Sequence, residues 1–215
     1  MYPPFGVQPQ NGFCSSRTTS PSRYGCCPTD AEWIAGIGTP LRTQLVSFAR
    51  RPEDVEALLA RYRAFWLAEH DRMTRCFPRA AEVVSELAAR GHPLGVVTAK
   101  VEEGAWRTLR HTGLDVHMGA VIGADSCARA KPDPEPVLLA LSRVGRSAGE
   151  AILVGDSPHD LVAGRRAGVR TVAALWGACT ADALRAAEPD HLLEDVGDLP
   201  ALVASLEPGA KEPAA

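Results

Sequence analysis

Two carboxylates four residues apart follow an apolar stretch in the segment ILVGDSPHDL, at Asp156 and Asp160. Carboxylates at the mouth of a sheet are hard oxygen ligands, and Mg²⁺ binds one or two of them together with waters and substrate phosphate. Asp160 has a second explanation, because Ser157 and Asp160 have the spacing of a capping box at a helix start. Asp156 has no such explanation and is the stronger candidate ligand. We expect His159 to be an exposed residue of the first helical turn.

Two further polar side chains follow apolar stretches of the sequence. Thr98 comes directly after PLGVV, where a hydroxyl followed by the N–H groups of a helix start suits a phosphate oxygen. A threonine that only caps the strand is the alternative. Lys131 lies in AKPDPEP, where the following proline keeps it out of helical geometry. Its ammonium can neutralise a transferring phosphoryl group, and a solvated loop lysine is the alternative.

The elements that must position these residues alternate between helix and strand from residue 76 onward. Short apolar segments rich in Val and Ile predict strands over 92–99, 118–125, 150–156, 170–176 and 190–195. Helical patterns lie between them, and several stop at a glycine, as at Gly91, Gly113 and Gly145. This alternation predicts an α/β fold with a Rossmann-like, doubly wound parallel sheet. Ligands of such sheets bind at the carboxyl ends of the strands, where the candidate residues lie.

Residues 30–75 have helical patterns only, with Asp30 as the expected cap of the first helix. Apolar side chains recur there at spacings of three and four residues, which predicts a helix with one buried face. We expect this face to be core rather than a ligand site; its members are Val55, Leu58, Leu59, Tyr62, Phe65 and Trp66.

Composition narrows the function classes. The chain has 215 residues and a formal net charge of −3, which gives no sign of a nucleic-acid partner. No apolar run is long enough for a membrane span, so we expect no membrane partner. The six cysteines have no metal-type spacing, and Cys26-Cys27 is an isolated adjacent pair. We expect a reducing, cytoplasmic compartment; composition does not predict an oligomeric state.

Three segments resemble motifs of a known family. GVVTAK, AKPDPEPV and ILVGDSPHDLVAGRRAG, in this order, resemble motifs two, three and four of the haloacid dehalogenase-like hydrolases. The resemblance runs from about residue 30 to residue 205, and the helical block is similar to the family's helical cap, including GIGTPL near its start. Within the family, VTAK, KPDPEPV, the RYRAFW…EHDRM helix and PDHLL are similar to the phosphoglycolate phosphatase group and related pyrophosphatases.

The resemblance implies roles for five core residues. Thr98 and Ala99 would bind the phosphoryl group, and Lys131 would bind it and offset its charge. Asp156 would ligate Mg²⁺, the implied cofactor. Asp160 would complete the metal site by ordering the metal's waters, or would hold Lys131.

The implied function is a Mg²⁺-dependent phosphatase that acts on a small, phosphoglycolate-like ester through an aspartyl-phosphate. Inorganic pyrophosphate is the alternative substrate, so the expected partner is a small phosphorylated metabolite. Cap residues near Gly38 and Arg42 would close over the substrate and select it. A catalytically inactive module that binds phosphate and metal is the alternative of another class.

The sequence departs from the family at its first motif, D-x-D-G-T, which supplies the nucleophile and the general acid/base. No Asp or Glu precedes Asp30, so both residues are absent from the expected position. A smaller departure is Arg79 in FPRA, where the family usually has Gly. Residues 1–29 are rich in Ser, Thr, Pro, Gly and Cys and have no helical or strand period. A disordered tail and a transit peptide are two interpretations; the one we favour is a non-native segment from a frameshift, a wrong start or a splice artefact.

In this fold the first strand lies between the strands that end at Val97 and Val154. Without that strand we expect a poorly stable sheet, because unpaired buried backbone groups cost about 1–3 kcal/mol each. The segment PFGVQPQ is a poor replacement because of its prolines. We therefore predict four parts: an atypical segment 1–29, a helical cap 30–76, a Rossmann-like core 77–207 and a tail 208–215.

Overall fold

The strands of the protein are all parallel and form two sheets among residues 28–207, the range that the computed structural model describes. In the first sheet, β1 (Leu94–Val97) pairs with β2 (Met118–Ile122). In the second, β4 (Arg170–Ala174) lies between β3 (Ile152–Gly155) and β5 (His191–Leu193). The predicted α/β class with a parallel Rossmann-like core is confirmed. Within this range no strand joins β1 to β3, the two strands between which the resemblance leads us to expect the family's first strand.

The helices of this core begin and end at the signals in the sequence. Ser157 caps α7 (Pro158–Ala167) through a capping box with Asp160, and Gly113 and Gly145 end α5 (Glu102–Thr112) and α6 (Glu135–Val144) in the left-handed conformation. Gly91 has the same left-handed conformation, with φ of 85°, directly after Arg90, the C-cap of α4 (Ala80–Ala89). The core helices are α4 (Ala80–Ala89), α5 (Glu102–Thr112), α6 (Glu135–Val144), α7 (Pro158–Ala167), α8 (Ala181–Arg185) and α9 (Leu199–Leu206).

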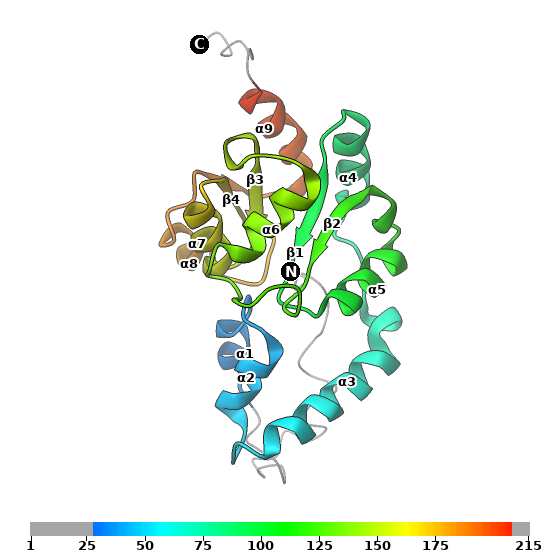
Figure 1. Ribbon diagram of the computed structural model, residues 1–215, viewed down its shortest axis with the longest axis vertical. Coiled ribbons are helices and arrows are strands. Elements are labelled where there is room, and N and C mark those ends of the chain that lie inside the picture. The colour runs from blue at the N-terminus through cyan, green and yellow to red at the C-terminus, as the bar shows by residue number, and fades with distance from the viewer. Residues whose placement is uncertain (1–27, 208–215) are drawn as a thin grey trace.

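Helix α6 connects the two sheets. It packs against β1 and β2 on one side and against α7 of the second sheet on the other. Figure 1 shows α6 in front of the space between β1–β2 and β3–β4. Tertiary packing by a shared helix therefore holds together sheets that no described backbone hydrogen bond joins.

The first three helices form a separate layer at the lower end of the molecule in Figure 1. They are α1 (Asp30–Ala35), α2 (Leu41–Phe48) and α3 (Asp54–Met73). The N-cap of α1 is Thr29, which forms a capping box with Glu32, so the expectation of Asp30 as the cap was wrong. Asp30 is instead the first helical residue, and its negative charge is stabilising beside the partial positive charge of the helix N-terminus.

The apolar face of α3 has two parts. Its first half is core, because Val55, Leu58 and Leu59 are buried with Leu45 of α2. The second half runs back to the core, where α3 contacts α5 and the Trp66 and His70 rings lie with their centroids 4.5 Å apart and their planes tilted by 60°. The aromatic end of this face is thus a junction between the helical layer and the core.

Arg79, the residue at which the family usually has Gly, is in the left-handed region with φ of 65°. A side chain with a Cβ is strained in this conformation, whereas glycine adopts it freely. The Arg79 guanidinium lies 3.3 Å from Asp195, in an ion pair with both side chains more than half exposed.

Several expectations fall outside the described residues. These concern the atypical segment up to residue 27, with the strand candidate PFGVQPQ and the Cys26-Cys27 pair, and the tail 208–215. The division into a cap at 30–76 and a core at 77–207 stays a prediction. In the part of the chain that the structure describes, no helix has the length and apolarity to cross a membrane.

Candidate active site

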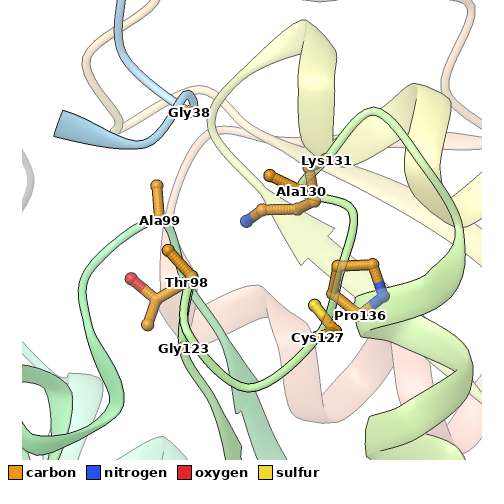
Figure 2. A pocket seen from close by; sticks show the side chains of 9 residues that line it. Gly38, Thr98, Ala99, Gly123, Cys127, Ala130, Lys131 and Pro136 are labelled. Carbon is orange, nitrogen blue, oxygen red and sulfur yellow. The ribbon is translucent and has the colours of Figure 1, made fainter. Parts of the chain in front are cut away.

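A small pocket lies at the carboxyl ends of β1 and β2, under the loop between α1 and α2. It combines a loop of the helical layer with the loops that follow two strands, the place that the fold predicts for a ligand. Figure 2 shows the Lys131 side chain extending across it toward the loop of Thr98 and Ala99. The lining residues are Gly38, Thr98, Ala99, Gly123, Ala124, Cys127, Ala130, Lys131 and Pro136.

Thr98 follows β1 directly and lines the pocket. Its backbone N–H donates to the Ile122 carbonyl at 2.9 Å, which extends the β1–β2 pairing by one residue. Its hydroxyl oxygen accepts the Lys100 N–H at 3.2 Å. The hydroxyl hydrogen is not used in that bond and can donate to a phosphate oxygen.

Lys131 is buried, with 8% of its surface exposed, so the alternative of a solvated loop lysine does not describe it. Its Nζ donates to the Val97 carbonyl at 2.9 Å and to Asp160 Oδ1 at 2.5 Å. Val97 is the last residue of β1 in the first sheet, and Asp160 lies in α7, the helix that follows β3 of the second sheet. The ammonium therefore links the carboxyl ends of both sheets at the edge of the pocket.

Asp160 is fully engaged by the protein. Oδ1 accepts from Lys131, and Oδ2 accepts from the Ser157 N–H at 3.1 Å and the Ser157 hydroxyl at 2.6 Å. A Cβ on Gly155 would lie 2.2 Å from the Asp160 Cβ, so only glycine at the end of β3 allows this close approach. Of the two roles that the resemblance implies for Asp160, this geometry suits the one that holds Lys131.

Asp156 sits at the end of β3, close to Asp160. The Asp156 Oδ2 accepts the Ala178 N–H at 3.2 Å. A Cβ on Gly177 would lie 2.1 Å from the Cβ of Asp156, so only glycine allows this loop to approach Asp156 so closely. Burial raises the pKa of Asp156, and the nearby Asp160 charge raises it further. A bound cation would offset the cost of keeping Asp156 charged in these surroundings. The site therefore fits Mg²⁺, which needs only one or two carboxylates when waters and phosphate complete its shell. No set of three or more His, Cys, Asp or Glu side chains in residues 28–207 is placed to hold a metal by itself.

The two cap residues have different positions. Gly38, with φ of 94°, lines the pocket, and a Cβ there would lie 2.5 Å from the Ser157 hydroxyl. Arg42 is not among the lining residues and pairs with Glu56 on α3, with 60% of its side chain exposed. His159 is half-buried rather than exposed as expected, and its Nδ1 is buried without a hydrogen-bond partner among the described residues.

Five lining residues received no role from the sequence: Gly123, Ala124, Cys127, Ala130 and Pro136. Gly123 and Ala124 directly follow β2, and Cys127 lies in the same loop. The rule that ligands bind after strand ends points to Gly123 and Ala124 as much as to Thr98. Their side chains carry no chemistry, so only the rule and not the residue type could have identified them.

The geometry so far is that of a small pocket with a buried lysine in its lining, and this lysine is bonded to a carboxylate. A family model for haloacid dehalogenase-like hydrolases matches residues 14–174, three quarters of the chain. The chain belongs to this family. The family assignment made from the three motifs is therefore confirmed.

Two sequence relatives of this family member are pyrophosphatases PpaX. The protein from Bacillus velezensis is 40% identical over 163 residues, which cover 76% of this chain and 74% of the relative. The protein from Halalkalibacterium halodurans is 36% identical over 183 residues, 85% of this chain and 82% of the relative. Among solved structures, a predicted phosphoglycolate phosphatase from Haemophilus somnus has a TM-score of 0.75 at 20% identity and covers 83% of this chain and 84% of its own. That likeness is one of fold.

Proposed function

We propose that this family member has the site of a Mg²⁺-dependent hydrolase of a small phosphorylated substrate, with the phosphoryl-binding part in the pocket of Thr98, Ala99 and Lys131. The observation that supports this most is the placement of Lys131. Its ammonium is buried at the pocket, fixed by a carbonyl of one sheet and a carboxylate beside the other. A cation held in this way is preorganised for an anionic ligand.

Each residue has a distinct role in the proposal. The Thr98 hydroxyl and the backbone at Ala99 donate hydrogen bonds to phosphoryl oxygens, and Lys131 offsets their charge. Asp156 is the carboxylate that holds Mg²⁺, which when bound neutralises further charge on the phosphoryl group. Asp160 acts through Lys131 and is a positioning residue.

Inorganic pyrophosphate is the substrate we propose to test first, because the two sequence relatives are named pyrophosphatases and cover most of this chain. A phosphoglycolate-like ester is the second candidate, and the expectation that ranked it first came from the motifs alone. Gly38 touches both the pocket and Ser157, so the cap loop is the element we expect to distinguish the two substrates.

The chain as written has no D-x-D pair before Asp30, and the described pocket lining contains no carboxylate. We propose that this chain binds Mg²⁺ and phosphate, and that hydrolysis requires a D-x-D-G-T strand. Binding without turnover, the inactive-module alternative, is then the behaviour of the sequence as written.

The test compares two proteins: the chain as written, and a version in which an apolar strand ending in D-x-D-G-T precedes Pro28. Phosphate release from pyrophosphate and from 2-phosphoglycolate is measured with Mg²⁺, and binding of inorganic phosphate is measured by calorimetry. We expect both proteins to bind phosphate and only the second to release it. A restored chain without turnover on either substrate would refute the hydrolase, and a chain that binds neither phosphate nor Mg²⁺ would refute the site.

The control in both proteins is Arg129→Met. Arg129 is a cation in the same loop as Lys131, but its side chain is 70% exposed and pairs with Asp133 and Glu135. Lys131→Met should abolish phosphate binding, whereas Arg129→Met should leave it within about twofold, because exposed ion pairs contribute only about 0–1 kcal/mol.

A further inference from the structure

A cluster of titratable side chains lies outside the pocket, where α3 meets α5. The His70 side chain and the Thr108 hydroxyl are buried there, and Lys100 reaches into the cluster from the loop after β1. The Lys100 Nζ lies 3.1 Å from Thr108 Oγ1 and 5.9 Å from the centre of the Trp66 ring. The proposed mechanism uses none of these groups.

The hydrogens of this cluster can be counted at Thr108. Its hydroxyl oxygen has three neighbours: the Gly104 carbonyl at 3.0 Å, Lys100 Nζ at 3.1 Å and His70 Nε2 at 2.9 Å. The hydroxyl has one hydrogen, and an ammonium only donates. If the hydrogen points to Gly104, His70 Nε2 must donate; if it points to His70, Nε2 accepts.

His70 distinguishes the two arrangements, because its Nδ1 lies 2.6 Å from Asp71 Oδ1 and must donate to that carboxylate. The first arrangement therefore requires a charged imidazolium, and the second a neutral ring. Burial lowers the pKa of His70, and the charge of Lys100 lowers it further. A charged Lys100 thus favours a neutral His70 whose Nε2 accepts the Thr108 hydrogen.

Lys100 also belongs to the wall of the pocket through its backbone. Its N–H donates to Thr98 Oγ1 at 3.2 Å, and its carbonyl accepts the Ala124 N–H at 2.8 Å. Thr98 and Ala124 both line the pocket. One residue therefore contacts the phosphate-binding hydroxyl with its backbone and the end of the cap helix α3 with its side chain.

We propose that Lys100 is a positioning residue that couples the end of α3 to the Thr98 hydroxyl in the pocket. The Lys100 ammonium is anchored by the Thr108 hydroxyl and by the face of Trp66, which attracts a cation. This anchor fixes the backbone from Thr98 to Lys100, and with it the direction of the hydroxyl. The importance of that hydroxyl for a ligand rests on the function proposed above.

The anchor depends on charge. Burial lowers the pKa of Lys100 to about 8, so the ammonium is present below this pH and is lost above it. The loss removes the attraction to Trp66 and a donor to Thr108. Three other charged or titratable groups face the cluster from α3 and α5: Asp71, Arg107 and His111.

The first measurement needs no ligand. The sequence has three lysines, at 100, 131 and 211, so ¹³C labelling of lysine side chains gives a spectrum that single variants can assign. We expect the Lys100 signal to titrate near pH 8 and the Thr98 methyl signal to shift with the same midpoint. A Thr98 signal that stays constant while Lys100 titrates would overturn the coupling.

The second measurement is calorimetric binding of inorganic phosphate with Mg²⁺ between pH 6.5 and pH 9.5. Lys100→Met should weaken binding about fivefold below pH 8, the effect of one misplaced hydrogen bond, and this difference should vanish above pH 9. Lys100→Arg keeps its charge at high pH, so it should bind like wild type below pH 8 and more tightly than wild type above pH 9. Equal affinities of wild type and Lys100→Met at every pH would contradict the proposal.

Two variants separate the possible failures. Arg107→Met removes another cation near the same Trp66 ring, at 5.6 Å, without touching the pocket loop, and should leave binding unchanged. Thr98→Val tests the site itself. If Thr98→Val binds phosphate like wild type, the proposed function is at fault; if Thr98→Val weakens binding and Lys100→Met does not, only the role of Lys100 is refuted.

Discussion

Asp156 is a half-buried carboxylate beside a second carboxylate, and its raised pKa has a consequence for stability. A raised pKa means that the folded state binds the proton more tightly, so this contribution to stability is present at low pH and is lost as pH rises through the folded pKa. In EDTA, Asp156→Asn should therefore lose less stability than wild type between pH 4 and neutrality. Urea unfolding at several pH values measures this.

Mg²⁺ should reverse the order of the two proteins. At about 100 times its Kd, a ligand that binds only the folded state stabilises it by about 2.7 kcal/mol. Mg²⁺ should raise the Tm of wild type and leave that of Asp156→Asn unchanged. The control is Asp182→Asn, a carboxylate with 98% of its side chain exposed, which should behave as wild type. An equal Mg²⁺ response of wild type and Asp156→Asn would exclude Asp156 as the ligand.

The buried pair of Lys131 and Asp160 predicts non-additive mutations. Removing one partner leaves a buried charge uncompensated, so Asp160→Ala should cost about 3 kcal/mol of unfolding free energy. Lys131→Met combined with Asp160→Ala should recover part of that loss, since neither charge then remains. Chemical denaturation of wild type and the three variants measures the unfolding free energies of this double-mutant cycle. Strictly additive losses would mean that the pair is not coupled.

Arg79 predicts a gain in stability. Arg79→Gly relieves a left-handed backbone strain of about 1–2 kcal/mol, loses an exposed ion pair of little energy and adds flexibility to the unfolded chain. We expect a net stabilisation of about 0.5 kcal/mol, seen as a higher Tm. Glu188→Gly, at the second position outside glycine with positive φ, should respond in the same direction. A lower Tm for both would show that the strain is unimportant.

At the scale of the elements, the loop of Gly38 joins the helical layer to the core. A Cβ at this position would lie 2.5 Å from the Ser157 hydroxyl, so Gly38→Ala should push the loop away from the start of α7. We expect weaker phosphate binding and a loss of stability beyond the backbone strain of about 1–2 kcal/mol. Calorimetry and thermal unfolding measure the two effects.

Gly91 is the matched control for this prediction. Its φ of 85° is close to that of Gly38, but a Cβ there meets nothing within 4 Å. Gly91→Ala therefore carries the backbone strain without the contact. If both alanine variants bind phosphate equally, the contact between the cap loop and α7 does not shape the pocket.

At the scale of the whole molecule, the core consists of two sheets whose facing strands, β1 and β3, have no described strand on one side. Edge strands have unpaired backbone groups and open more easily than central ones. In hydrogen exchange, we expect β4, which pairs with β3 and β5, to exchange slowest, and β1 and β3 faster. Protection of β1 and β3 equal to that of β4 would mean that a further strand covers them.

The sequence by itself determined the elements, the family and the order of the site residues. The rules involved are local: a capping box spans three residues, a left-handed glycine stops its own helix, and the period of apolar residues separates strand from helix. Where such a rule failed, as at Thr29 and Asp30, the helix began within one residue of the expectation. The motif that carries Asp156 and Asp160 could be recognised for the same reason, because its spacing is local.

Only the tertiary structure decided how these residues meet. Lys131 and Asp160 are 29 positions apart, and their contact depends on how α6 holds the two sheets together. The separation of Gly38, inside the pocket, from Arg42, outside it, follows from the docking of a whole helical layer. The partners of Lys100 come from α3 and α5 at once. Such contacts follow from packing between distant segments, and no local pattern of residues encodes them.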